Sequence, residues 1–176
     1  RSTRKTVTIL FVGLVCLRKG IRLLLEAWRL LRKEYRHIRL QLAGALMPDA
    51  RALIKNFSHD FSVEYMGPVT RERLRELYKG ADIFVLPSIE EGFGMVVGEA
   101  MAMGLPVVVS DQVGASDVLL AGEDGFIFSS GRADQLASIL ALLINNQELR
   151  LQVGHKALEK SSLLSWERYG DQTISF

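Results

Sequence analysis

Two glutamates with seven residues between them are the side chains of this sequence best placed for chemistry. Glu91 stands in a loop that precedes an expected helix, and Glu99 lies about one and a half turns inside that helix. Two carboxylates at this spacing can accept hydrogen bonds from hydroxyl groups at two places on one ligand. The alternative is a plain helix start, with Glu91 favoured by the helix dipole and Glu99 as a solvated surface charge.

The residues between the two glutamates favour an anionic ligand. Gly92 and Gly94 allow the backbone to approach a bound molecule closely, and Phe93 stands between them. The first amides of the helix have no partner within it, and together with the helix dipole they attract phosphate. These amides belong to Gly94, Met95 and Val96. Phosphate-binding amides beside two spaced carboxylates predict a ligand in which a sugar is joined to phosphate.

A second loop, with the sequence F-V-G-L-V-C-L-R-K-G-I over residues 11–21, supplies a cation. Gly13 ends the first expected strand, and Lys19 comes just before the next helix. A cation and free amides then meet at one anion site, which suits a diphosphate leaving group whose charge grows in the transition state. A solvated loop lysine is the alternative. Arg18 is a further candidate phosphate ligand, although exposure to solvent fits it better.

Two further turns follow expected strands. In residues 67–71 the backbone at Val69 can frame a nucleobase, and a tight turn in which Thr70 caps a helix fits equally well. Residues 110–117 can line the floor of a pocket, or they can form an ordinary loop.

The elements that must position these loops alternate between strand and helix. Apolar runs rich in valine and isoleucine predict strands at residues 7–12, 38–43, 63–66, 83–86, 106–110 and 126–128. Helical patterns occupy residues 21–35, 50–57, 70–79, 94–103, 133–145 and 148–160, and a last one begins at Trp166. This alternation predicts an α/β fold: a doubly wound, Rossmann-like parallel sheet in a single domain over residues 7–176, preceded by a linker at residues 1–6. Ligands of such sheets bind at the carboxyl ends of the strands, where the four loops lie.

Composition excludes several classes of protein. The net charge of +2 in 176 residues gives no broad surface for nucleic acid. Cys16 is the single cysteine, so a reducing compartment such as the cytoplasm is expected. No apolar run is long enough to cross a membrane, and the three histidines lack metal-ligand spacing, so no metal site is predicted. The basic helix at residues 21–35 is expected to face solvent, with weak association to the inner face of an anionic membrane as the alternative.

Several motifs in order resemble one large family. They are A-D-I-F-V-L-P-S at residues 81–88, E-G-F-G-M-V-V-G-E-A-M-A-M-G-L-P-V-V at 91–108, V-G-x5-K-G at 12–20, D-G-F-I-F at 124–128 and S-W-E-R-Y at 165–169. Together they are similar to the C-terminal half of the retaining group 1 glycosyltransferases, which have two Rossmann-like domains, the GT-B fold. The resemblance covers essentially the whole chain.

The resemblance implies a role for each candidate residue. The C-terminal domain of the family holds a nucleoside-diphosphate sugar, with Glu91 on the sugar, Glu99 on the ribose, Lys19 on the diphosphate and the backbone near Val69 on the base. An N-terminal domain, not included in this chain, binds the acceptor, so the isolated chain is expected to be inactive. No cofactor or metal is implied. Many family members carry an arginine at the position of Leu14, so either Arg18 substitutes for it from the other end of the loop or donor binding is weaker.

Two other functions remain open from the sequence. A non-catalytic partner would keep the fold and bind only a nucleotide or a protein, which Leu14 supports. A GT-B-type sugar-nucleotide epimerase would need acid and base residues that the sequence does not reveal. A dehydrogenase is disfavoured, since no G-x-G-x-x-G follows the first strand.

Overall fold

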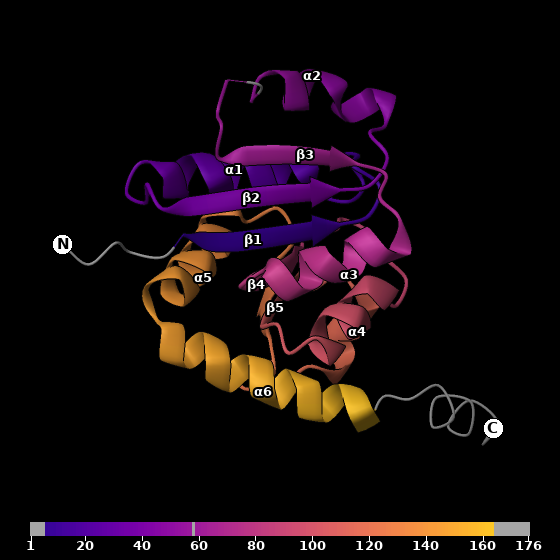
Figure 1. Cartoon of the computed structure of the whole chain (residues 1–176), viewed down its shortest axis with the longest axis vertical. Coiled ribbons are helices and arrows are strands. Elements are labelled where there is room, and N and C mark those ends of the chain that lie inside the picture. Colours follow the sequence, from indigo (N-terminus) through magenta and orange to yellow (C-terminus); the bar gives the residue numbers. More distant parts are fainter. Residues whose placement is uncertain (1–5, 58, 164–176) are drawn as a thin grey trace.

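The computed structural model describes residues 6–57 and 59–163 of the chain. Within these residues, a single sheet of six strands is surrounded by helices (Figure 1). The strands are β1 (Val7–Val12), β2 (Ile38–Ala43), β3 (Val63–Gly67), β4 (Ile83–Leu86), β5 (Val107–Ser110) and β6 (Phe126–Phe128). The helices are α1 (Ile21–Arg32), η1 (Pro48–Ala50), α2 (Arg51–Lys55), α3 (Arg71–Gly80), α4 (Met95–Ala102), η2 (Gly114–Val118), α5 (Ala133–Asn145) and α6 (Gln147–Leu163). The helix expected from Trp166 lies outside the described residues.

All five pairings in the sheet are parallel, and the strand order is β3-β2-β1-β4-β5-β6. The chain first builds outward from β1 to β3, then returns to the other side of β1 and builds outward again from β4 to β6. This is the order of the doubly wound dinucleotide-binding sheet. The predicted fold class, a Rossmann-like α/β single domain, is confirmed.

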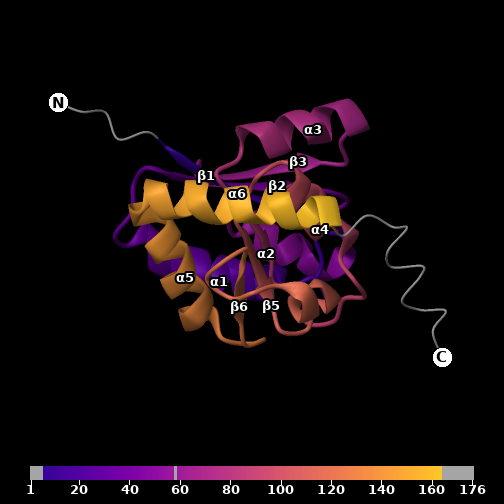
Figure 2. The same cartoon turned by 90° about the horizontal axis from the view of Figure 1, so that it is seen from below.

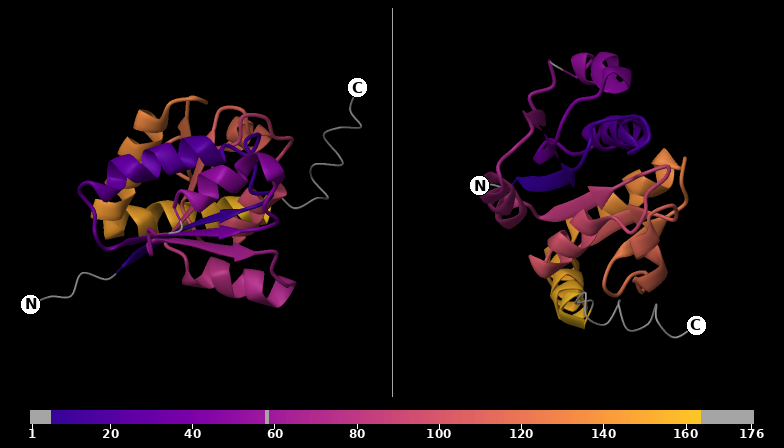
Figure 3. Two further views of the ribbon diagram at one scale, coloured as in Figure 1. Left: turned by 90° about the horizontal axis from the view of Figure 1, so that it is seen from above. Right: turned by 90° about the vertical axis from the view of Figure 1, so that its right-hand side faces the viewer.

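The apolar runs form strands because helices cover both faces of the sheet. Every residue of β4 and β5 is buried, as continuous apolar strands require. Helix α1 buries the predicted stripe, which consists of Ile21, Leu24, Leu25, Trp28 and Leu31. Figure 3 shows α1 and α5 on one side of the strands and α3 on the other. Helix α6 runs across the molecule and packs against α4 (Figure 2).

Hydrogen bonds between residues close in the sequence set two of the helix boundaries. Thr70 caps α3 as predicted, because its hydroxyl accepts a hydrogen bond from the amide of Arg73 at 3.3 Å. Helix α1 ends at Arg32 instead of at residue 35. The guanidinium of Arg32 donates to the carbonyl oxygens of Tyr35 and Arg36, so these residues form a turn that leads into β2.

Candidate functional site

The order in which the chain adds strands to the sheet reverses between β1 and β4, which is the switch point of the fold. The loops that follow these two strands lead to helices on opposite sides of the switch point, and ligands of open α/β sheets bind in the crevice between such loops. Both loops were predicted to carry site residues, at residues 13–20 and 88–94. The fold therefore brings both loops to the carboxyl ends of the strands, as the sequence predicted.

The backbones of these two loops touch. The amide of Ile89 donates to the carbonyl oxygen of Arg18 at 2.8 Å. Gly20, at the start of α1, adopts φ 75° and lies so close to the end of β4 that a Cβ atom would stand 1.8 Å from the carbonyl oxygen of Pro87. Only glycine fits both the conformation and the contact. This close approach places Lys19, the preceding residue, beside the second loop.

Lys19 forms an ion pair with Glu91 across the two loops. The side chains are 13% and 15% exposed, so the pair is largely withdrawn from water. Burial, followed by repulsion from Arg18, lowers the pKa of Lys19. The hydroxyl of Ser88 lies 3.5 Å from the same carboxylate oxygen. The sequence placed these residues in separate loops, and the structure brings them into contact.

The N-terminus of α4 opens beside this ion pair. Gly94 is its N-cap with φ 76°, and no side chain caps the helix. The amide of Val97 is bonded to the carbonyl of Gly94, whereas residues 6–57 and 59–163 supply no hydrogen-bond partner to the amides of Met95 and Val96. Two free donors at the positive end of a helix dipole can bind an oxyanion.

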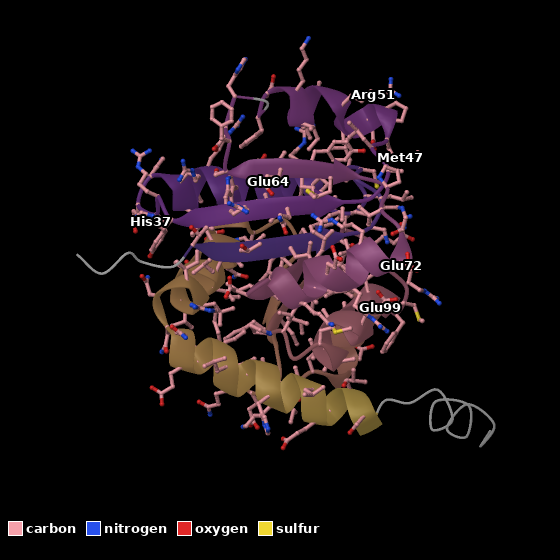
Figure 4. All side chains as sticks on the ribbon, in the orientation of Figure 1. His37, Met47, Arg51, Glu64, Glu72 and Glu99 are labelled. Carbon is pink, nitrogen blue, oxygen red and sulfur yellow. The ribbon has the colours of Figure 1, made fainter. Side chains whose placement is uncertain are left out.

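Glu99 lies on the exposed face of α4, at the same end of the molecule (Figure 4). Its Oε2 accepts a hydrogen bond of 2.9 Å from the hydroxyl of Tyr78, a buried residue of α3. Burial, and then the charge of Glu99, raise the pKa of Tyr78 far above its usual range, so the hydroxyl remains a donor. No pattern in the sequence indicates this partner, because the contact depends on how α3 packs beside α4.

The loop after β5 supports the loop after β4. The amide of Gly114 donates to the carbonyl of Gly92 at 2.7 Å, and the amide of Ala115 donates to that of Phe93 at 3.0 Å. A Cβ atom on Gly114 would lie 2.6 Å from the carbonyl oxygen of Gly92. Residues 110–117, considered as a pocket floor, therefore hold the glycine loop in place through its backbone.

The remaining candidate residues lie around this edge. Gly13 follows β1 directly with φ 143°, a conformation that favours glycine. Leu14 presents a side chain that is 42% exposed, at the position where an arginine was expected from the family resemblance. The exposed Arg18 donates to the carbonyl oxygen of Glu90 at 3.4 Å, so it is held at the same loop junction. Val69 is partly buried in the turn after β3.

A separate pocket of about 580 Å³ opens at the other end of the sheet, where the strands begin. Its walls include Thr6, His37, Asp82, Pro106 and Arg150, which lie near the starts of β1, β2, β4 and β5 or on α6. Figure 4 shows His37 at the end of the molecule far from Glu99. The guanidinium of Arg150 already donates to the last carbonyls of α5. This pocket is thus remote from the candidate site residues Lys19, Glu91 and Glu99.

Comparison with known proteins identifies the family. The family model described as "Glycosyl transferases group 1" matches residues 2–160. The chain belongs to this family. A Haemophilus influenzae protein described as an uncharacterized glycosyltransferase is 35% identical over 170 residues, which are 95% of this chain and 46% of that relative. The chain thus spans less than half the length of this curated relative.

Solved structures agree on the fold. The C-terminal domain of a group 1 glycosyltransferase from Francisella tularensis superposes with a TM-score of 0.83 at 21% identity, covering 91% of this chain and 86% of that one. HepE from Anabaena, in complex with UDP-glucose, gives a TM-score of 0.83 at 22% identity over 97% of this chain and 49% of that one. The predicted resemblance to a C-terminal GT-B domain is confirmed.

Proposed function

We propose that this chain is the donor half of a retaining glycosyltransferase and binds a nucleoside-diphosphate sugar. The observation that carries the proposal is the Lys19–Glu91 ion pair beside the uncapped start of α4, at the switch point of the sheet. A cation and two free amides suit a diphosphate, while Glu91 and Glu99 provide acceptors for hydroxyl groups on either side of it. The UDP-glucose complex of HepE, which shares this fold, supports the choice of ligand.

The proposed chemistry needs no nucleophile from this chain. The bond between the anomeric carbon and the β-phosphate oxygen breaks, and the acceptor oxygen bonds to the same face of that carbon. The acceptor proton passes to the departing phosphate oxygen. Lys19 and the α4 amides stabilise the charge that develops on the diphosphate. Glu91 orients the sugar, and its contact with Lys19 keeps both side chains fixed.

The proposal includes a second domain that binds the acceptor. An N-terminal acceptor domain would close over the carboxyl edge of the sheet, exclude water and complete the cleft. The length of the Haemophilus relative leaves room for such a domain. Leu14 favours one alternative, a family member that binds a nucleotide without transferring sugar. Release of nucleoside diphosphate by the full-length enzyme, dependent on an acceptor, would exclude that alternative.

Replacing each of the two glutamates is expected to change ligand affinity in a different way. Glu99→Ala should weaken binding of the bare nucleoside diphosphate by about 1–2 kcal/mol, because ribose contacts are lost. Glu91→Ala should spare the bare nucleotide and remove the added affinity of the sugar nucleotide. Calorimetric titration of both variants with UDP and UDP-glucose measures the difference. If each variant loses the same affinity for both ligands, the assignment of the two acids is wrong.

We further propose a weak, peripheral contact with anionic membrane surfaces through the half of the domain that contains α1. Residues 6–62 carry ten lysines and arginines against four acids, whereas residues 63–163 carry eight against fourteen. The excess of positive charge therefore lies on the β1-α1-β2-α2 half. None of the helices in the described ranges has the length and apolar character that crossing a membrane requires.

Charge reversal tests this contact. Each basic residue near an anionic surface contributes about 1 kcal/mol, so Lys33→Glu with Arg36→Glu should lower partitioning onto phosphatidylglycerol vesicles about tenfold or more. Both side chains are exposed and lie beyond the last turn of α1. Arg71→Glu with Arg75→Glu on α3 is the matched control with the same change in net charge. Equal loss in both variants, or no vesicle binding by the wild type, would contradict the proposal.

A further inference from the structure

The Tyr78 hydroxyl connects two helices at the edge of the candidate site. Tyr78 lies near the end of α3 and is 3% exposed, with its ring 6.1 Å from that of Phe84 in β4. Its hydroxyl is 2.9 Å from Oε2 of Glu99 and 3.4 Å from the carbonyl oxygen of Val96, both on α4. A buried ring thus carries one polar atom to the carboxylate that the proposed function assigns to the ribose.

Glu99 needs such a partner to act as a selective acceptor. It is exposed on a helix surface, where a glutamate side chain samples several rotamers in water. Fixing one carboxylate oxygen removes some of that freedom before the ligand arrives, and pre-ordered groups bind with less entropic cost. Because Oε2 accepts from Tyr78, Oε1 remains available to a hydroxyl of a ligand.

Tyr78 itself is poorly placed to touch a ligand. Only a few per cent of its surface is exposed, and its hydroxyl lies within hydrogen-bond range of two oxygens of α4. Its hydroxyl proton is retained because the buried position and the neighbouring carboxylate raise the pKa of Tyr78. The group can therefore influence binding only through Glu99 and the first turns of α4.

We propose that Tyr78 is a positioning residue that holds the Glu99 carboxylate ready to accept hydrogen bonds from the ribose hydroxyls of the nucleotide. This inference rests on the proposed function of the site. It adds a specificity role: the Tyr78–Glu99 pair is what makes the site prefer a ribonucleotide over one that lacks these hydroxyls.

A double-mutant cycle with two ligands tests the role. The probes are whichever of UDP, GDP and ADP binds the wild type most tightly, and its 2′,3′-dideoxy analogue. Tyr78→Phe should raise the dissociation constant of the ribonucleotide about three- to tenfold while leaving that of the dideoxy analogue within about twofold. In a Glu99→Ala background, Tyr78→Phe should have no further effect on either ligand.

Tyr35→Phe is the matched control. The hydroxyl of Tyr35 accepts a hydrogen bond of 2.7 Å from Asn145, at the opposite edge of the sheet, so its loss should leave both dissociation constants unchanged. If Tyr78 had only a structural role, Tyr78→Phe would raise the dissociation constants of both ligands equally. That result would overturn the inference. If Glu99→Ala loses ribose selectivity but Tyr78→Phe keeps it, the positioning role is wrong and the proposed function stands. If none of the three nucleotides binds the wild type, the proposed function fails and the inference with it.

Discussion

Replacing Lys19 by alanine is expected to raise the dissociation constant of a nucleoside diphosphate about 10- to 150-fold, or about 1.5–3 kcal/mol. Lys19 is the cation that the fold places against Glu91, and its side chain is only 13% exposed. Solvent screens such a charge less than one at the open surface, so its contact with phosphate contributes more. Isothermal titration calorimetry of the folded variant measures the effect.

Two controls separate the loss of a phosphate ligand from damage to the loop. Lys19→Ala leaves Glu91 without its counter-charge in a partly buried place, so the double variant with Glu91→Gln should recover stability but not affinity for the nucleoside diphosphate. Arg18→Ala removes a neighbouring exposed cation and should weaken binding much less. Unchanged affinity in folded Lys19→Ala protein would remove Lys19 from the site, and a larger effect of Arg18→Ala would transfer its role.

Gly20→Ala is expected to reduce the free energy of unfolding by about 3–5 kcal/mol. The backbone at this residue is left-handed, which disfavours any side chain, and the new methyl group would overlap the carbonyl of Pro87. Relief requires the loop after β1 to move away from the end of β4. We expect this movement to separate Lys19 from Glu91 and to abolish measurable nucleotide binding in the protein that remains folded.

Gly122→Ala is the matched control for this substitution. Gly122 has φ 82°, close to that of Gly20, but a Cβ atom there would meet nothing within 4 Å. It should therefore show the conformational cost alone, about 1–2 kcal/mol. Chemical denaturation of both variants gives the comparison. Equal losses would mean that the contact with Pro87 adds nothing to the fold.

The fold was largely predictable because its signals are local. Apolar patterns, nearly continuous in β1 and β4 and alternating in β2, predicted these three strands with the bounds that the structure has, and the capping threonine predicted the start of α3. The short helix expected at residues 50–57 is present with narrower bounds, as α2, and a 3-10 turn precedes it. The order of the strands follows from pairing across the sheet, which periodicity along the chain does not report.

The candidate site was predictable to the level of its loops. Glycine spacing and helix starts placed Lys19, Glu91 and Glu99 at one edge. The pairing of Lys19 with Glu91 joins residues 72 positions apart, and no pattern in the sequence measures such a distance. Tyr78 was missed for the same reason. The support that Gly114 gives to Gly92 depends on two loops that follow neighbouring strands.

The central claim is that a nucleotide sugar binds in the crevice between the loops after β1 and β4. The most direct test is to map backbone amide chemical shifts of this chain by NMR during titration with UDP-glucose, GDP-mannose and ADP-glucose. We predict saturable changes for one of them, with a dissociation constant of about 0.1–1 mM, because the proposed function assigns one wall of the cleft to a second domain. The changes should centre on residues 13–20 and 92–96. Changes centred instead on the pocket around His37 and Arg150, or no saturable binding of any donor, would contradict the account.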